Sequence, residues 1–220
     1  MQDFTVQIKL LSEAIFGSGQ SVPGDIDVDV VYDEYGIPYF KGKTFKGKVR
    51  EEVENLRYIF KEAYGLDIDE HIKNMFGESS MLEDKHGILK FSDCTLDKKI
   101  IQALKYGIKS NMFTYNEVLN SLTQTRNFTS IDKDGISKDK SLRSARVIKK
   151  DICFFCKIEI EKELSDLEKA LLASGISSLK SIGTMESRGK GEISARLYLK
   201  NKDITDEYIN NLEKEVTKIG

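Results

Sequence analysis

The segment from Lys41 to Arg50 has the residue types and spacing of a phosphate-binding site. It carries five basic residues and no acidic residue, and two glycines interrupt it. A helix that begins here would direct unpaired N–H groups and the positive end of its dipole at an anion. A cationic first turn is unfavourable at that end of the dipole, which favours a bound anion. The alternative is an ordinary solvated helix start, in which Lys48 and Arg50 pair with Glu52 and Glu54.

Three carboxylates lie just upstream, at Asp25, Asp27 and Asp29, and they alternate with apolar residues. In a strand they would point to one face at intervals of about 7 Å. Carboxylates so arranged repel one another unless a cation or a basic partner lies between them. They could bind a hard divalent ion or activate a hydroxyl, or they could form the solvated face of an edge strand. Acids beside a cationic segment indicate phosphodiester chemistry or phosphodiester positioning.

A second glycine-rich basic loop runs from Gly183 to Gly191 and contains Arg188, Gly189 and Lys190. Its position just before an expected strand would suit a phosphate cradle made of backbone N–H groups. It is neither a Walker loop nor a dinucleotide-binding fingerprint. A plain hairpin turn is the alternative interpretation.

The region 123–150 is polar and basic, and residues 123–146 lack periodicity. We interpret 123–146 as a long functional loop or a projecting hairpin, whose cations could follow a nucleic-acid backbone while Phe128 stacks on a base. These cations are Arg126, Arg143, Arg146, Lys149 and Lys150. The alternative is a disordered surface loop.

The cysteines and histidines indicate no separate chemistry. Cys153 and Cys156 would face opposite sides of a strand and no second such pair exists, so buried structural cysteines are expected rather than zinc or redox ligands. His71 and His86 lack any nucleophile–base pattern, and we interpret each as a surface residue.

The composition places limits on the function. The chain has 220 residues, 40% hydrophobic and 32% charged, with a net charge of −2. These values are typical of a globular protein without a global field for nucleic acid, so any such binding must come from local patches. Three cysteines, no signal peptide and no membrane-length apolar run predict a cytoplasmic protein with reduced thiols and no membrane partner.

Apolar periodicity predicts the elements that position these segments. The main elements are strands at 2–16, 88–96, 147–161 and 190–199 and helices at 44–64 and 162–174, with Thr44 and Gly175 as caps. Their βαββαβ order predicts an α+β, ferredoxin-like (RRM-like) core with a thumb-like projection, in a single domain over 1–220. Insertions are expected at about 17–43, 66–87 and 97–146. Further elements are expected at 25–30 (extended) and at 68–76, 98–107, 115–122 and 204–218 (helical).

Four blocks of the sequence, taken in order, resemble the RAMP superfamily of CRISPR-associated proteins, in particular the backbone subunit of type III effectors. The first block is Ile26-Asp-Val-Asp-Val-Val-Tyr-Asp33 followed by Gly42-Lys-Thr-Phe-Lys-Gly-Lys-Val-Arg50. The second is Phe91-Ser-Asp-Cys94, and the third is Thr125-Arg-Asn followed by Ile131-Asp132 and Leu142. The fourth is Gly183 with Ser187-Arg-Gly-Lys-Gly191.

The resemblance implies an RNA-binding protein with an RRM-like core, in which Thr44, Lys46, Gly47 and Arg50 hold a guide RNA together with Arg188 and Gly189. The thumb, about 123–146, would wedge between guide and complementary target RNA. Other effector subunits, including copies of this chain or paralogues, would be its partners.

The resemblance also implies that Asp27 cuts bound target RNA with a divalent metal ion, Mg²⁺ or Mn²⁺. The chain departs from the family pattern, which commonly has Pro-Gly-Ser-Ser where this sequence has Lys41-Gly-Lys-Thr44. Neighbouring Asp25 and Asp29 leave the choice of catalytic carboxylate open. A non-catalytic RNA-binding scaffold is one alternative. An endonuclease that processes precursor guide RNA is another, although no histidine lies near the glycine-rich loop in the sequence.

Overall fold

The computed structural model describes residues 3–19, 26–79, 84–129 and 143–219. Asp25 and residues 130–142 of the expected thumb lie outside these ranges. The described chain is a mixed α+β structure with antiparallel sheets. None of its described helices is both long enough and apolar enough to cross a lipid bilayer.

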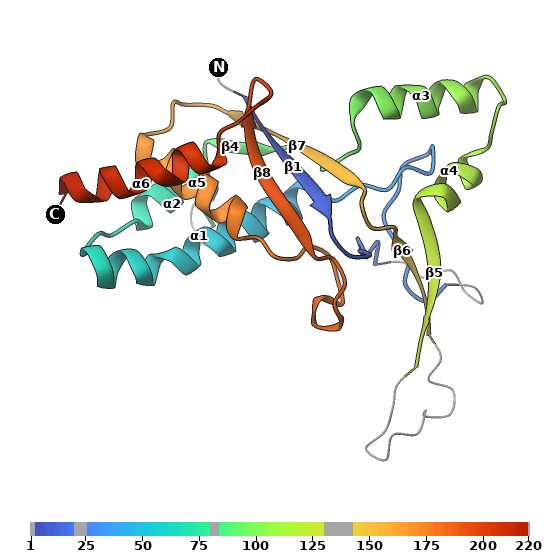
Figure 1. The fold of residues 1–220 in the computed structure, drawn as a ribbon, viewed down its shortest axis with the longest axis horizontal. Helices are drawn as coiled ribbons and strands as arrows, with labels where there is room; N and C mark the ends of the chain where they lie inside the picture. Colours follow the sequence, from blue (N-terminus) through green and yellow to red (C-terminus); the bar gives the residue numbers. More distant parts are fainter. Residues whose placement is uncertain (1–2, 20–25, 80–83, 130–142, 220) are drawn as a thin grey trace, which may run out of the picture.

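A five-stranded antiparallel sheet forms the centre of the molecule (Figure 1). Its strand order is β4-β7-β1-β8-β9. The strands are β4 (Leu89–Phe91), β7 (Cys153–Ile160), β1 (Phe4–Leu10), β8 (Ile193–Leu199) and β9 (Lys202–Asp203). Val6 of β1 lies opposite Cys156 of β7 on one side and Leu197 of β8 on the other. This register places apolar residues of the three strands on one face, because alternate side chains of a strand point to the same side.

Two helices cover that apolar face, α1 (Gly42–Tyr64) and α5 (Asp166–Ser178). Phe45, Val49 and Val53 of α1 are fully buried, as the helical spacing predicts. Ser165 and Glu168 form a capping box at the start of α5: the side chain of each residue accepts a hydrogen bond from the backbone N–H of the other. On the opposite face, Lys9, Lys157 and Glu159 are exposed.

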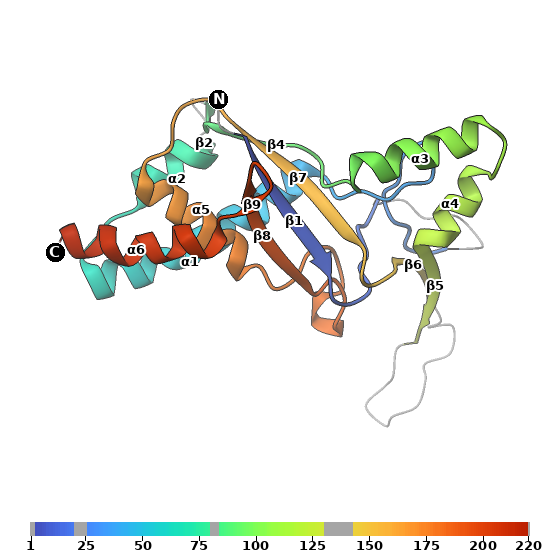
Figure 2. The same cartoon turned by 45° about the horizontal axis from the view of Figure 1, so that its top comes forward.

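The remaining helices are α2 (Asp69–Phe76), α3 (Lys98–Lys109), α4 (Tyr115–Leu122), α6 (Thr205–Ile219) and the short 3₁₀ helix η1 (Glu186–Arg188). Helices α2 and α6 lie beside α1 and α5, whereas α3 and α4 lie at the other end of the molecule (Figure 2). A small hairpin of β2 (Gly77–Ser79) and β3 (Asp84–His86) follows α2.

A second hairpin, β5 (Thr123–Phe128) with β6 (Arg143–Ile148), projects away from the central sheet (Figure 1). The sequence allowed a loop or a hairpin here, and the structure shows paired strands over these residues. We call β5 and β6 the projecting hairpin.

Several predicted boundaries were wrong, for identifiable reasons. Helix α1 begins at Gly42, so Thr44 is not its cap; the Asp93 carboxylate accepts the Gly42 N–H at 2.7 Å instead. Gly175 does not end α5 but lies inside it. A Cβ at this position would approach the Val53 side chain to 2.4 Å. A glycine at this helix–helix contact therefore allows close packing of α1 and α5.

The expected strands also differ from the observed ones. The strand at 147–161 is divided between β6 and β7 by a turn in which Asp151 has φ 67°. The described part of the piece expected at 25–30 forms isolated bridges at Ile26, Val28 and Val30 rather than a continuous strand. The strand predicted at 88–96 is reduced to β4, and bridges at Cys94 and Thr95 continue it irregularly.

Candidate nucleic-acid interface

The basic segment at the start of α1 divides into two flanks. Residues two positions apart on a helix point about 200° away from each other, so Lys46 and Arg50 lie on one flank and Thr44 and Lys48 on the other. The two flanks line different depressions of the surface. Gly47 lies between them, exposed, and nothing stands within 4 Å of a Cβ built on it.

Lys46 and Arg50 share one pocket, as their spacing of four predicts. Lys46 Nζ donates to the Leu89 carbonyl of β4 at 2.9 Å, and Arg50 Nη1 donates to the Gly77 carbonyl of β2 at 3.2 Å. Burial, followed by the nearby charge of Arg50, lowers the pKa of Lys46. Arg50 also pairs with Glu54 at 2.7 Å, so the solvated-helix interpretation is correct for this one contact.

The other flank faces the glycine-rich loop. Thr44 and Lys41 line a small cavity with Gly183 and Thr184. Lys48 pairs with Glu186 of η1 at 3.3 Å rather than with Glu52. The structure therefore brings Thr44 and the 183–191 loop together, as the resemblance implies, while Lys46 and Arg50 lie on the far flank of the helix.

The glycine-rich loop is tightly built at its base and open at its tip. A Cβ on Gly191, which has φ 77°, would lie 2.0 Å from the Ile182 carbonyl oxygen, so only glycine fits there. Gly189 has φ 70° and open space around it. Arg188 is exposed, and its side chain has no ion-pair partner among residues that the structure describes. The tip thus presents a free cation beside an accessible backbone.

Glu13 joins this loop to the projecting hairpin, a role that no sequence pattern predicted. Its carboxylate accepts from Arg126 Nη2 and from Lys190 Nζ, both at 2.6 Å, and also from Gln124. Hydrogen bonding from Arg126, opposed by burial and assisted by Lys190, lowers the pKa of Glu13 to about 2. Arg126 and Lys190, both predicted to bind RNA, are therefore held in ion pairs.

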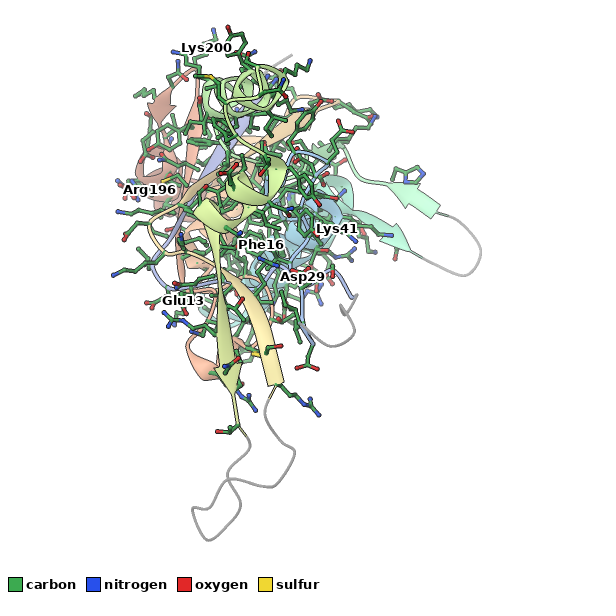
Figure 3. The ribbon with its side chains drawn as sticks, turned by 90° about the vertical axis from the view of Figure 1, so that its right-hand side faces the viewer. Glu13, Phe16, Asp29, Lys41, Arg196 and Lys200 are labelled. Carbon is green, nitrogen blue, oxygen red and sulfur yellow. The ribbon has the colours of Figure 1, made fainter. Side chains whose placement is uncertain are left out.

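Asp29 fixes the hairpin on its other side. Its carboxylate lies 3.0 Å from Nε of Arg146 on β6, and the side chains are only 7% and 15% exposed. It also accepts the Val30 N–H at 2.8 Å. Figure 3 shows Glu13 and Asp29 on opposite sides of the base of the hairpin. Asp29 is thus a structural residue, and the reading of the acidic row as a solvated strand face is wrong at this position.

Asp27 is exposed, in contrast, and lies against the start of β6. Its Oδ2 accepts the backbone N–H of Ser144 at 2.7 Å, and its own N–H donates to the Ser144 carbonyl at 3.0 Å. These two bonds hold the carboxylate at the side of the projecting hairpin. Of the two candidate catalytic acids that the structure describes, Asp27 is the one whose carboxylate can reach a ligand.

The side chains around Asp27 determine which kind of metal ion this site could bind. Within the described ranges, no group of three or more His, Cys, Asp or Glu residues could hold a metal. Mg²⁺, however, is commonly bound through one or two carboxylates together with substrate phosphates. Asp27 suits that mode of binding, in which the RNA supplies the other ligands.

The other predicted residues of the hairpin are partly available. Arg143, at the start of β6, is exposed. Phe128, at the end of β5, is half-buried, with Lys190 Nζ 6.0 Å from the centre of its ring. A base that stacks on Phe128 would have to share this ring with the Lys190 ammonium.

The cysteines and histidines form no separate reactive group among the described residues. Cys94 and Cys156 are buried, as expected of structural cysteines, and burial raises the pKa of the Cys94 thiol. Cys153 is only half-buried, so the expectation of a buried side chain is wrong at that position. His71 lies 3.5 Å from Glu168 in α5, and His86 lines the pocket of Lys46 and Arg50. Neither histidine touches the glycine-rich loop.

The chain matches the model of the RAMP superfamily over residues 7–194. It is similar to a chain in the cryo-EM structure of the type III-B Cmr-beta bound to cognate target RNA, with TM-score 0.64, 16% identity, and coverage of 94% of this chain and 99% of that one. It is also similar to a chain of type III-B Cmr-beta in the apo state, with TM-score 0.63, 16% identity, and coverage of 89% and 97%. At this identity the likeness shows a common fold. No curated protein matches the chain.

Proposed function

Because the chain belongs to the RAMP superfamily, we propose that it is a guide-RNA-binding backbone subunit of a type III CRISPR ribonucleoprotein effector that acts in antiviral defence. The similar structures are subunits of type III-B complexes, one of them bound to cognate target RNA, which supports this role. The proposed partners are guide RNA, complementary target RNA and other effector subunits, including copies of this chain or paralogues.

The core that carries this function is, we infer, ferredoxin-like. The chain order β1-α1-β4-β7-α5-β8, with β1 between β7 and β8 in the sheet, is that of a split βαβ arrangement. The small hairpin β2–β3, helices α3 and α4 and the projecting hairpin are insertions into this order.

One observation carries the proposal: four segments from three separate regions of the sequence form a continuous chain of contacts. The start of α1 meets the glycine-rich loop through Lys48 and Glu186. That loop meets the projecting hairpin through Lys190, Glu13 and Arg126. The hairpin in turn meets the acidic segment through Ser144 and Asp27. A nucleic-acid strand that follows these segments would pass free cations, open glycines and one exposed carboxylate.

The residues of the proposed interface have two different roles. Arg188, Gly189, Gly47, Thr44 and Arg143 are exposed and suited to contact the RNA backbone. Arg126 and Lys190 share the single negative charge of Glu13, so they position the hairpin and the loop and together contribute less net charge to RNA than two free cations would. This is a refinement of the predicted set, in which all these residues had one role.

We further propose that Asp27 makes the subunit an endoribonuclease on bound target RNA. Ser144 holds one carboxylate oxygen, and the other is available to orient or deprotonate a ribose 2′-hydroxyl. A Mg²⁺ or Mn²⁺ ion bound by Asp27 and RNA phosphates would neutralise charge that develops on the phosphodiester. The projecting hairpin beside Asp27 would hold the target strand in a defined position.

The test is cleavage by the assembled ribonucleoprotein. The effector is purified with its guide, and complementary RNA and Mg²⁺ are added to complexes that contain wild-type chain, Asp27→Ala or the exposed control Asp151→Asn. We expect wild type and Asp151→Asn to cut, and Asp27→Ala to bind target without cutting. Cleavage that survives Asp27→Ala would overturn the catalytic assignment. A wild-type complex that binds target and never cuts, at any Mg²⁺ or Mn²⁺ concentration, would select a non-catalytic scaffold.

A precursor-processing endonuclease is disfavoured by the positions of the histidines. His71 is engaged with Glu168, and His86 lies on the far flank of α1 from the glycine-rich loop. Neither histidine therefore stands beside the glycine-rich loop, where such an enzyme would need one.

A further inference from the structure

We propose that the pocket between α1, β2 and β4, the α1 pocket, binds a single nucleotide unit of RNA, with its phosphate on Lys46 and Arg50 and its base on Phe91. This inference rests on the proposed RNA-binding function and specifies a subsite within it. The pocket is lined by Lys43, Lys46, Arg50, His86, Lys90 and Phe91, among other residues. Its volume of about 580 Å³ lies within the roughly 300–1,000 Å³ of small-molecule sites.

The cationic end of the pocket has capacity for an anion. Lys46 is half-buried and uses one of its three N–H donors on Leu89, and Arg50 uses Nε and Nη1 on Glu54 and Gly77. Two ammonium hydrogens and the Nη2 group therefore remain for a ligand. The two cations stand one helical turn apart, and their mutual repulsion would be relieved by a phosphate between them.

The charges around the α1 pocket also favour a bound anion. Lys90 is neutralised by Glu161, and Arg50 is paired with Glu54. No described carboxylate lies within ion-pair distance of Lys43 or Lys46, and Glu78 is the only acid among the described lining residues. The pocket is therefore electropositive even though the chain as a whole carries a net charge of −2.

The other end of the pocket is aromatic. Phe91 is half-buried, packs edge-to-face on Phe45 with 6.0 Å between ring centres, and stacks with Phe76 at 6.5 Å. These two contacts fix the plane of the Phe91 ring, and the ring still reaches the pocket surface. A fixed, partly exposed aromatic ring is a platform on which any base can stack. A phosphate end and a stacking end in one pocket match a nucleotide better than inorganic phosphate.

The probes for this site are adenosine 5′-monophosphate, ribose 5-phosphate and adenosine, titrated into the full chain by NMR or calorimetry. We expect the monophosphate to bind roughly 5-fold or more tightly than ribose 5-phosphate, because of base stacking, and more tightly than adenosine. Lys46→Gln should weaken its binding by about 10-fold or more, because a charged hydrogen bond is lost. Phe91→Leu should reduce the affinity for the monophosphate to that for ribose 5-phosphate.

Two further variants keep the test decisive. Lys43→Gln removes an exposed cation of the pocket and should weaken the binding of adenosine 5′-monophosphate. This variant tests the pocket even if Phe91→Leu fails to fold. Lys48→Gln lies on the same helix but outside the pocket and should leave nucleotide affinity unchanged. Equal affinity for the monophosphate and ribose 5-phosphate, or equal losses in Lys43→Gln and Lys48→Gln, would overturn the nucleotide assignment.

Binding of a guide-length RNA is measured on the same samples, so that the two proposals can fail separately. If wild-type chain binds this RNA but none of the three small probes, the α1 pocket inference is wrong and the RNA-binding function stands. If it binds neither, the proposed function itself is wrong.

Discussion

Glu13 accepts hydrogen bonds from the guanidinium of Arg126 at 3.0 and 2.6 Å, and this contact fixes the projecting hairpin to the segment that follows β1. Lys190 reaches the same carboxylate from the glycine-rich loop. A single acid, 13% exposed, therefore orders two segments that the proposed function brings to RNA. Ion pairs here position the interface and also reduce its net charge.

Glu13→Gln should lower stability at neutral pH but not in acid. The folded pKa of about 2 lies below the usual 4.5, so the stabilisation is fully present above pH 4.5 and is lost as the pH falls toward 2. A depression of this size corresponds to at most about 3 kcal/mol. Urea unfolding of wild type and Glu13→Gln at several pH values checks this, with the exposed Glu192→Gln as the control. A deficit in Glu13→Gln that stayed constant down to pH 2 would contradict the ion-pair explanation.

Asp29→Asn should be far more destabilising than Asp27→Asn, although the two residues are neighbours. The Asp29 variant leaves the Arg146 charge nearly buried and unpaired, which costs about 3 kcal/mol or more. The Asp27 variant weakens one hydrogen bond at the surface and should cost about 1 kcal/mol or less. Thermal or urea unfolding of both variants measures the difference. Equal losses would mean that Asp29 and Arg146 do not form the buried pair.

Periodic burial is the part of this fold that the sequence predicts well. Phe4, Val6 and Ile8 alternate with polar residues, and Phe45, Val49 and Val53 repeat at helical spacing, so β1 and α1 follow from local pattern alone. The short strand β4 did not follow in this way, because its flanking bridges depend on partners distant in sequence, such as the pairing of Cys94 with Phe40.

The residues of the site were predicted from the sequence, but the ion pairs and hydrogen bonds between them were not. The basic start of α1, the glycine-rich loop and Asp27 were all identified from residue types. Which acid neutralises which cation depends on tertiary contacts, and Glu13 lies 113 residues from Arg126. Asp27 and Asp29 look equivalent in sequence, and only packing against Ser144 and Arg146 separates an exposed carboxylate from a buried one.

Gly47→Ala should stabilise the free protein and weaken RNA binding. Glycine inside a helix costs about 0.5–1 kcal/mol relative to alanine, and a Cβ on Gly47 meets nothing within 4 Å. If an RNA backbone packs against α1 at this point, the added methyl group would obstruct it. The melting temperature and the affinity for guide-length RNA are measured for Gly47→Ala. Gly42→Ala is the contrasting variant and should be destabilised, because its Cβ would lie 2.4 Å from the Ser92 carbonyl oxygen. Unchanged RNA affinity in Gly47→Ala would remove this position from the interface.

Arg188→Ala and Lys190→Ala should separate RNA contact from structural support, although the two residues are only two positions apart. Arg188 is exposed, so its loss should leave stability unchanged and remove one phosphate contact. For single-stranded RNA, each lost contact reduces the slope of log affinity against log salt concentration by about 0.7. Lys190→Ala removes one of the two cations from Glu13, so it should lower stability and raise the pKa of that carboxyl. The slope of log affinity against log salt concentration should change less in Lys190→Ala than in Arg188→Ala, because the Lys190 charge is already paired. Filter binding of guide-length RNA over a salt series, together with urea unfolding, measures both effects. A slope unchanged in Arg188→Ala but reduced in Lys190→Ala would reverse the two roles and show that RNA displaces Lys190 from Glu13.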